Sequence, residues 1–213
     1  MSDLFFYLSE TPMTALSDHF KDAIARIDAA NGTNPNKEVF EGKEYPKEVL
    51  YSERMTDWLH KFEPNASEAL QLAARAQHIR RWAIPRSEYP MNRKGYNDWR
   101  ITLAKFHGDT TAAIMKQAGY DDAMCERVKA LLLKDRIKLE DPDGQTLEDV
   151  ICLVFLAYYF IPFAPHYTEP KLVGIVQKTW KKMSERGHAA ALELAPALPA
   201  DLLAVVQKAI TTA

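Results

Sequence analysis

The apolar run VICLVFLAYYFIPFA, from Val150 to Ala164, constrains the fold of this chain more than any other segment. It is too short to span a bilayer comfortably, and Pro162 interrupts it. A helix that is apolar on nearly every side is expected to pass through the middle of a domain. We therefore predict a buried core helix that begins near Thr146, no membrane contact, and a cytoplasmic location.

Apolar residues recur at helical spacing along most of the remaining chain, and no segment alternates like a β-strand for long. The first helix is predicted to start near Thr14 or Ser17. Asn65 with Glu68 resembles a capping box for the third helix, and Asp121 is the predicted cap of the fifth. A polar loop is expected over residues 32–46. The pattern predicts an all-α protein, a single compact helical bundle of about eight helices.

The length and composition are those of one globular unit. A chain of 213 residues with 47% hydrophobic and 26% charged residues can bury a substantial core. We predict one all-α domain over residues 1–213, divided into an N-terminal helix and loop (1–46), a core (47–190) and a C-terminal helix (191–213).

The charge and the cysteine content exclude some classes of protein. The net charge is only -2, so a general nucleic-acid coat protein is not expected. Cys125 and Cys152 lie in helical sequence and are predicted to be buried thiols rather than a disulfide. Two cysteines are also too few for a cysteine-based zinc site. The N-terminus MSDLFFYLSETPM lacks the basic start of a secretion signal.

The most informative segment for function is QHIRRWAIPRSEYPMNRKGYNDWR, residues 77–100, which we call the basic segment. It contains six Arg or Lys and two acids, interleaved with Trp and Tyr. Pro85 and Pro90 should break the preceding helix, so the segment is predicted to be partly loop. This pattern favours a site for an anionic small molecule or nucleotide, although the arginines could instead form surface ion pairs. The candidate substrate-binding residues are Arg80, Arg81, Arg86 and Arg100.

A second basic stretch, KTWKKMSERGH at residues 178–188, has four cations and one acid. A solvated helix face is the simpler interpretation. If both basic stretches lie on one surface, RNA becomes a candidate ligand.

Three inward-facing polar residues on different predicted helices could share a divalent metal ion: His78, His107 and Asp149. Zinc, manganese or iron bound there would lower the pKa of a bound water and supply a nucleophile. Glu148 is the candidate base, or a residue that orients a ligand. The alternatives are ordinary: interior histidines are usually hydrogen-bonded core residues, Asp149 could complete a capping box with Thr146, and Glu148 could be solvated.

Four stretches resemble an uncharacterised family, the domain of unknown function 4202: AARAQHIRRWAIPRSEYPMNRKGYNDWR, the LAKFH that follows it, LEDVICLVFL and KTWKKMSERGH. The resemblance covers roughly residues 18–190. The family implies no activity.

A more distant similarity is to the HD-domain metal phosphohydrolases, which are all-helical. That resemblance implies that His78, His107 and Asp149 hold the metal and that the reaction is hydrolysis of a nucleotide or another phosphorylated small molecule. The sequence departs from the HD pattern because Ile79 stands where the aspartate of the His-Asp pair would be, and an early histidine has no clear counterpart. The alternatives are a non-catalytic helical module that binds RNA or a nucleotide, and a helical interaction protein.

Overall fold

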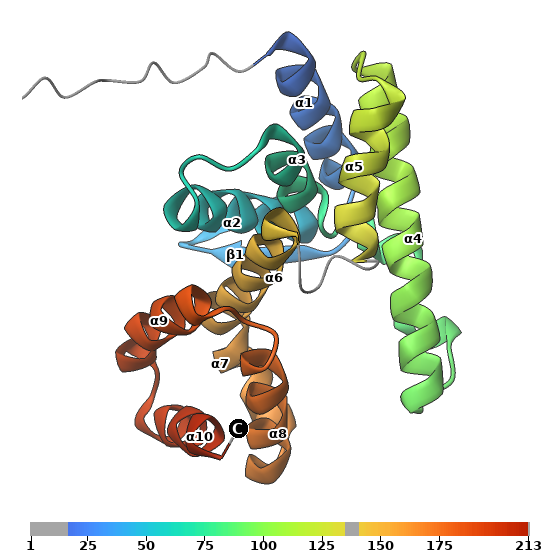
Figure 1. Cartoon of the computed structure of the whole chain (residues 1–213). Helices are drawn as coiled ribbons and strands as arrows, with labels where there is room; N and C mark the ends of the chain where they lie inside the picture. Colours follow the sequence, from blue (N-terminus) through green and yellow to red (C-terminus); the bar gives the residue numbers. More distant parts are fainter. Residues whose placement is uncertain (1–16, 135–140, 213) are drawn as a thin grey trace, which may run out of the picture.

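The computed structural model of the protein describes residues 17–134 and 141–212. This part of the chain is all-α apart from one short hairpin, which confirms the predicted fold class (Figure 1). The helices are α1 (Asp18–Gly32), α2 (Lys47–Phe62), α3 (Glu68–Ala76), α4 (Arg93–Gln117), α5 (Asp122–Leu133), α6 (Pro142–Val154), α7 (Phe160–Phe163), α8 (Glu169–Trp180), α9 (Glu185–Leu194) and α10 (Ala200–Thr211).

The larger hydrophobic core joins the first six helices. Each of them contributes at least one almost fully buried side chain, among them Ile27, Met55, Leu70, Met115, Leu131 and Val150. The long helix α4 lies beside α5 along one flank of the molecule (Figure 1). Burial of this apolar surface is the main force that holds α1–α6 together.

A second core lies between α7, α8 and α10, with Phe160, Val176 and Val206 as members. Helix α6 reaches this core through a π-helical turn, η3 (Phe155–Tyr159). The apolar run therefore contributes buried side chains to both of these cores, as expected for a core helix. By length and composition alone the stretch Pro142–His166 could cross a membrane, yet 50% of its most apolar window is buried within the protein. Both predicted thiols, Cys125 and Cys152, are free and buried.

The segment predicted as a polar loop instead forms an antiparallel hairpin, so that part of the prediction was wrong. Strand β1 (Lys37–Phe40) pairs with β2 (Lys43–Pro46), with Lys37 opposite Pro46. Glu41 and Gly42 connect the strands with φ angles of 50° and 76°. Two positive φ angles suit a tight hairpin turn. Strands of four residues are too short to produce a recognisable alternation in the sequence.

Helix starts show where capping was predicted well and where it was not. Ser17 and Asp121 cap α1 and α5 as expected. Helix α3, however, is capped by Ser67, whose hydroxyl accepts a bond from the Leu70 amide, and not by Asn65. Helix α6 begins at Pro142 behind Asp141, four residues before the predicted start. Asp141 accepts bonds from two first-turn amides, which satisfies donors that would otherwise lack partners.

A buried polar network joins the end of α1 to α2. We call it the Asn31 network; its members are Asn31, Asn34, Glu48 and Ser52, all buried. Asn31 Nδ2 donates to Ser52 Oγ (3.1 Å), and Ser52 Oγ donates to the Glu48 carbonyl (2.7 Å). Asn34 donates to the Glu48 carboxylate. Asn31 Oδ1 also accepts from the amide of Arg80 (2.9 Å), so the network extends to the chain after α3.

Replacing Asn31 tests how much this network contributes to stability. The Asn31→Ala variant should lose about 1–3 kcal/mol of unfolding free energy, because the Arg80 amide loses its acceptor and the buried Ser52 hydroxyl loses the Asn31 donor. Chemical denaturation followed by circular dichroism measures the change. The control is Asn65→Ala, at an exposed position that forms no side-chain cap. Equal stability of the two variants would contradict the role given to Asn31.

Candidate functional site

The basic segment leaves the helical path directly after α3. That helix ends at Ala76 rather than near Trp82 as predicted, and Arg80 adopts a left-handed backbone with φ 48° four residues later. The bond from the Arg80 amide to Asn31 stabilises this conformation. Two short 3-10 turns follow, η1 (Arg81–Ala83) and η2 (Arg86–Glu88). The segment is partly loop, as predicted, but the helix ends nine residues before Pro85, so the prolines do not break it.

The segment then folds back against the first turn of α4. Asn92 caps this helix by accepting a bond from the Gly95 amide (2.8 Å). A Cβ atom at Gly95 would lie 2.2 Å from the Pro90 carbonyl oxygen, so only glycine allows this approach. Arg86 donates to the carbonyls of Tyr89 (2.8 Å) and Pro90 (2.7 Å), which fixes the shape of the turn.

A pocket of about 470 Å³ lies between the hairpin, the start of α2 and the basic segment. We call it the basic pocket. Its lining comprises four cations, one carboxyl group, two indoles and three uncharged residues: Lys37, Lys47, Arg81, Arg86, Glu48, Trp82, Trp99, Asn36, Ile84 and Pro85. The volume falls within the range of small-molecule sites. The excess of cations gives the lining a positive electrostatic potential.

Arg81 is the central cation of the basic pocket. Its guanidinium lies 4.9 Å from the ring centroid of Trp99, and its Nη1 donates to His78 Nε2 (2.8 Å). Burial lowers the pKa of Arg81, against the opposing effects of Tyr51 and Glu48. No carboxylate in residues 17–134 or 141–212 forms an ion pair with it. A partly desolvated guanidinium without a counter-ion is well suited to a phosphoryl group.

The start of α2 adds further positive potential at the pocket. The helix begins at Lys47, and Pro46 at the cap position provides no side-chain acceptor for the first-turn amides. The Lys47 amide itself is bonded to the Asn36 carbonyl (3.0 Å), which joins the two ends of the hairpin. A helix N-terminus favours negative charge, and the one acidic side chain in this first turn is Glu48.

The structure separates the four predicted arginines into two pairs. Arg81 and Arg86 line the basic pocket, whereas Arg80 and Arg100 are exposed and do not. The guanidinium of Arg100 lies 5.8 Å from the Tyr96 ring centroid. Sequence reasoning missed Lys37 and Lys47, because they lie thirty or more residues before the basic segment and only the hairpin places them beside it.

The two predicted metal-binding histidines are neighbours, with ring centroids 6.2 Å apart. His78 stacks on Tyr51 at 3.9 Å, and burial followed by the charge of Arg81 holds its pKa well below the usual range. His107 Nδ1 donates to the Ile79 carbonyl (2.8 Å), and burial lowers its pKa to about 4. Both rings are therefore neutral near pH 7. His107 Nε2 is buried without a hydrogen-bond partner in the described structure.

Asp149, the third predicted metal ligand, forms hydrogen bonds at the start of α9 instead. Its carboxylate is buried and accepts bonds from the Ser184 amide (2.8 Å), the Ser184 hydroxyl (2.6 Å) and Gln145 Nε2 (3.2 Å). Ser184 is the N-cap of α9, so Asp149 joins α6 to the start of α9. Within the described ranges, no three His, Cys, Asp or Glu side chains are grouped so that they could hold a metal ion. The structure thus brings His78 and His107 together but not Asp149, so these three side chains do not form one metal site.

Glu148, the predicted base, lies between two ammonium groups. Its carboxylate pairs with Lys134 Nζ (2.7 Å) and Lys182 Nζ (3.5 Å). Burial acts to raise the pKa of Glu148, but the two lysines outweigh it and the pKa is lower than usual. Glu148 does not line the basic pocket.

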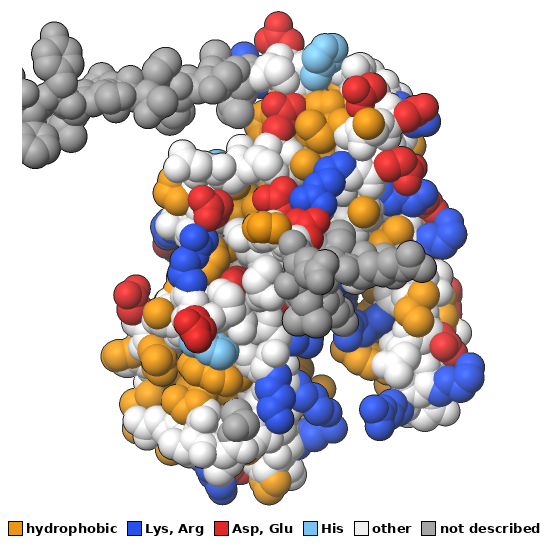
Figure 2. All heavy atoms as spheres, in the orientation of Figure 1, with side chains coloured by type: hydrophobic (Ala, Val, Ile, Leu, Met, Phe, Trp, Pro, Cys, Tyr) orange, Lys and Arg blue, Asp and Glu red, His pale blue; other side chains and the backbone are white. Residues whose placement is uncertain are grey.

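The second basic stretch is divided between two helices and is partly neutralised. Residues 181–184 form the bend between α8 and α9. Lys182 pairs with Glu148, and Arg186 pairs with Glu63 (3.0 Å). Figure 2 nevertheless shows Lys and Arg side chains on the lower half of one face, over both α8 and the N-terminal part of α4.

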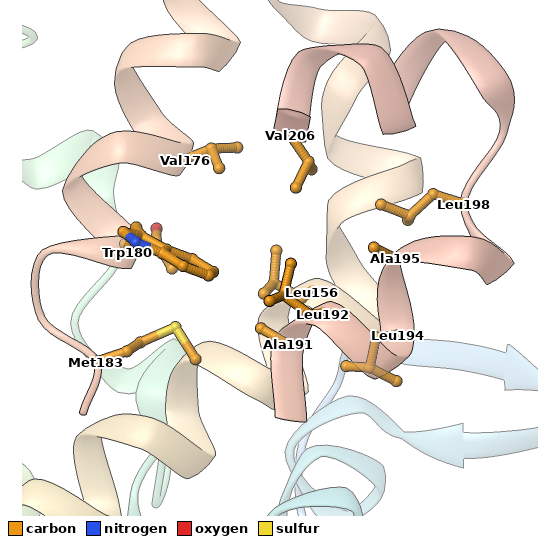
Figure 3. A pocket seen from close by; sticks show the side chains of 11 residues that line it. Leu156, Val176, Trp180, Met183, Ala191, Leu192, Leu194, Ala195, Leu198 and Val206 are labelled. Atoms are coloured by element: carbon orange, nitrogen blue, oxygen red, sulfur yellow. The ribbon is translucent and has the colours of Figure 1, made fainter. Parts of the chain in front are cut away.

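A cavity of about 20 Å³ lies between η3, α8, α9 and α10, with room for roughly one water molecule. Apolar side chains, including Trp180, Met183 and Val206, surround it (Figure 3). It contains no charged group, so it does not compete with the basic pocket as a site for an anion.

The structural role of Asp149 can be tested by truncation. Asp149→Ala should lower the unfolding free energy by about 1.5–3 kcal/mol, because bonds to a charged acceptor are lost at a buried helix start. Thermal and chemical denaturation measure the change, with the exposed Glu193→Ala on α9 as the control. Unchanged stability together with loss of a bound metal would show that Asp149 is a ligand instead.

Residues 21–206 match the family model described as "Domain of unknown function (DUF4202)". No curated protein and no solved structure matches the chain. The expected similarity to HD-domain phosphohydrolases is accordingly not shown. Since the match covers most of the 213 residues, the chain belongs to the DUF4202 family.

Proposed function

We propose that the protein binds a phosphorylated small molecule in the basic pocket, and that a nucleotide is the ligand class that fits best. The observation that carries this proposal is Arg81, a partly desolvated guanidinium that faces the pocket and has no carboxylate partner in the described structure. Such a charge is costly unless an anion compensates it.

The rest of the lining supports the same ligand class. Lys37, Lys47 and Arg86 add three positive charges around Arg81, which is more than one phosphoryl group requires. Trp82 and Trp99 supply the kind of aromatic surface on which a nucleobase can stack. A volume of about 470 Å³ is of the size that a small ligand occupies.

Arg81→Met tests the proposal directly. The variant should bind ATP and pyrophosphate about 10- to 100-fold more weakly, because it loses a charge-assisted contact of about 1.5–3 kcal/mol. Titration calorimetry, or quenching of tryptophan fluorescence, gives the dissociation constants. Arg100→Met removes the same charge outside the pocket and should leave them nearly unchanged. Failure of the wild type to bind any phosphate compound, or equal losses in both variants, would overturn the proposal.

Metal-dependent hydrolysis is the second candidate function, and one observation favours it. His107 Nε2 is a buried, neutral imidazole nitrogen without a partner, and the His78 ring is adjacent. These are the protein groups from which a metal ligand could come. His78 would have to release Arg81 to take part, because its Nε2 accepts the bond from that guanidinium.

Elemental analysis tests this second candidate. Protein purified without chelators or a metal-affinity column should contain close to one zinc, manganese or iron per chain if the histidines hold a metal. His107→Gln should then lose the metal, whereas the exposed His166→Gln should retain it. Protein that stays metal-free after dialysis against zinc or manganese would eliminate this function and leave phosphate binding unaffected.

A further inference from the structure

Among the described residues that line the basic pocket, Glu48 is the only one with a carboxyl group. It lies in the first turn of α2 and is 6% exposed. Its Oε2 accepts a bond from Asn34 within the Asn31 network, so the carboxyl group cannot turn away into solvent without breaking that contact. No Lys, Arg or His in the described ranges forms an ion pair with it.

The charges that face Glu48 come from every wall of the pocket. Lys47 precedes it on α2, Arg81 faces it from the turn after α3, and Glu38 lies on β1. Lys37 and Arg86 complete the charged lining. Burial raises the pKa of Glu48 above its ordinary value of 4.5, although Lys47 and Arg81 oppose the rise. The free pocket thus contains a carboxyl group for which the charged form is already disfavoured.

We propose that Glu48 couples ligand binding to proton uptake: when a phosphorylated ligand occupies the basic pocket, Glu48 takes a proton from solvent. This inference rests on the proposed function. A phosphoryl group beside an ionised Glu48 would place like charges together at a partly desolvated site, which strongly disfavours ionisation of the carboxyl group. Neutral Glu48 removes the repulsion, and its O–H can donate to a phosphoryl oxygen, so the residue selects for an acceptor at that position.

The direction of the pH dependence follows from the sign of the shift. The ligand raises the pKa of Glu48 further, so its pKa is higher in the complex than in the free protein. The affinity for the ligand should be greatest at a pH below the pKa of Glu48 in the free protein. It should fall as the pH rises from that value to the pKa of Glu48 in the complex. Proton uptake should occur only in that interval, which begins above pH 4.5 because the free pKa is already raised.

Titration calorimetry of the full chain with pyrophosphate, from about pH 5 to about pH 8 in buffers of different ionisation enthalpy, measures the uptake. The variant is Glu48→Gln, which has nearly the same shape and cannot ionise. Glu44→Gln removes an exposed carboxyl group from β2 and is the control. Protonation of pyrophosphate itself contributes about equally in all three proteins. For each pyrophosphate bound, the wild type and Glu44→Gln should take up more protons than Glu48→Gln, by a difference of up to about one.

The outcomes separate this inference from the proposed function. Tight binding with equal proton uptake in wild type and Glu48→Gln overturns the role of Glu48 and leaves the binding site intact. Absence of binding to wild type at every pH overturns both. If Glu48→Gln does not fold, the wild type is titrated with sulfate, whose charge is constant in this pH range. Sulfate binding without proton uptake would then overturn the inference, and uptake that peaks above pH 4.5 would support it.

Discussion

The arrangement of the basic pocket depends most on the hydrogen bonds of the Asn31 side chain. Its two polar atoms bind Ser52 on α2 and the backbone of Arg80, and Ser52 and Asn34 bind Glu48 in turn. Three chain segments that are distant in sequence are thereby joined in the interior. Buried hydrogen bonds of this kind are costly to leave unmade, so they specify one arrangement of the segments.

Desolvation sets the electrostatic character of the site. His78 can accept a bond from Arg81 only while its ring is neutral, and burial against Tyr51 keeps it neutral. Arg81 is then enclosed between His78 and the face of Trp99. Neither neighbour neutralises its charge, so Arg81 contributes an uncompensated positive charge to the lining of the pocket.

The hairpin wall of the pocket is attached to the rest of the protein through Arg54. This buried guanidinium pairs with Glu38, donates to the Tyr159 hydroxyl (2.9 Å) and lies 4.5 Å from the Tyr158 ring centroid. Both tyrosines belong to the π-helical turn η3, a kind of irregularity that often accompanies functional sites. The apolar run therefore supports the strand that carries Lys37, and it also contributes residues to the hydrophobic cores on both sides of it.

The sequence by itself determined the all-α class, the burial of most of the apolar run, two helix caps and the concentration of positive charge in residues 77–100, because these depend on local periodicity and composition. It could not show the role of Asp149. Its position on the inward face of a helix is the one expected of a metal ligand, but its carboxylate binds Ser184, 35 residues later. It also could not show that Lys37, Lys47 and Glu48 meet Arg81. Those placements arise from the hairpin and from the left-handed turn at Arg80, which depend on hydrogen bonds between distant segments. Tertiary structure alone decided which of the basic residues face a common pocket, since charge in a sequence carries no direction in space.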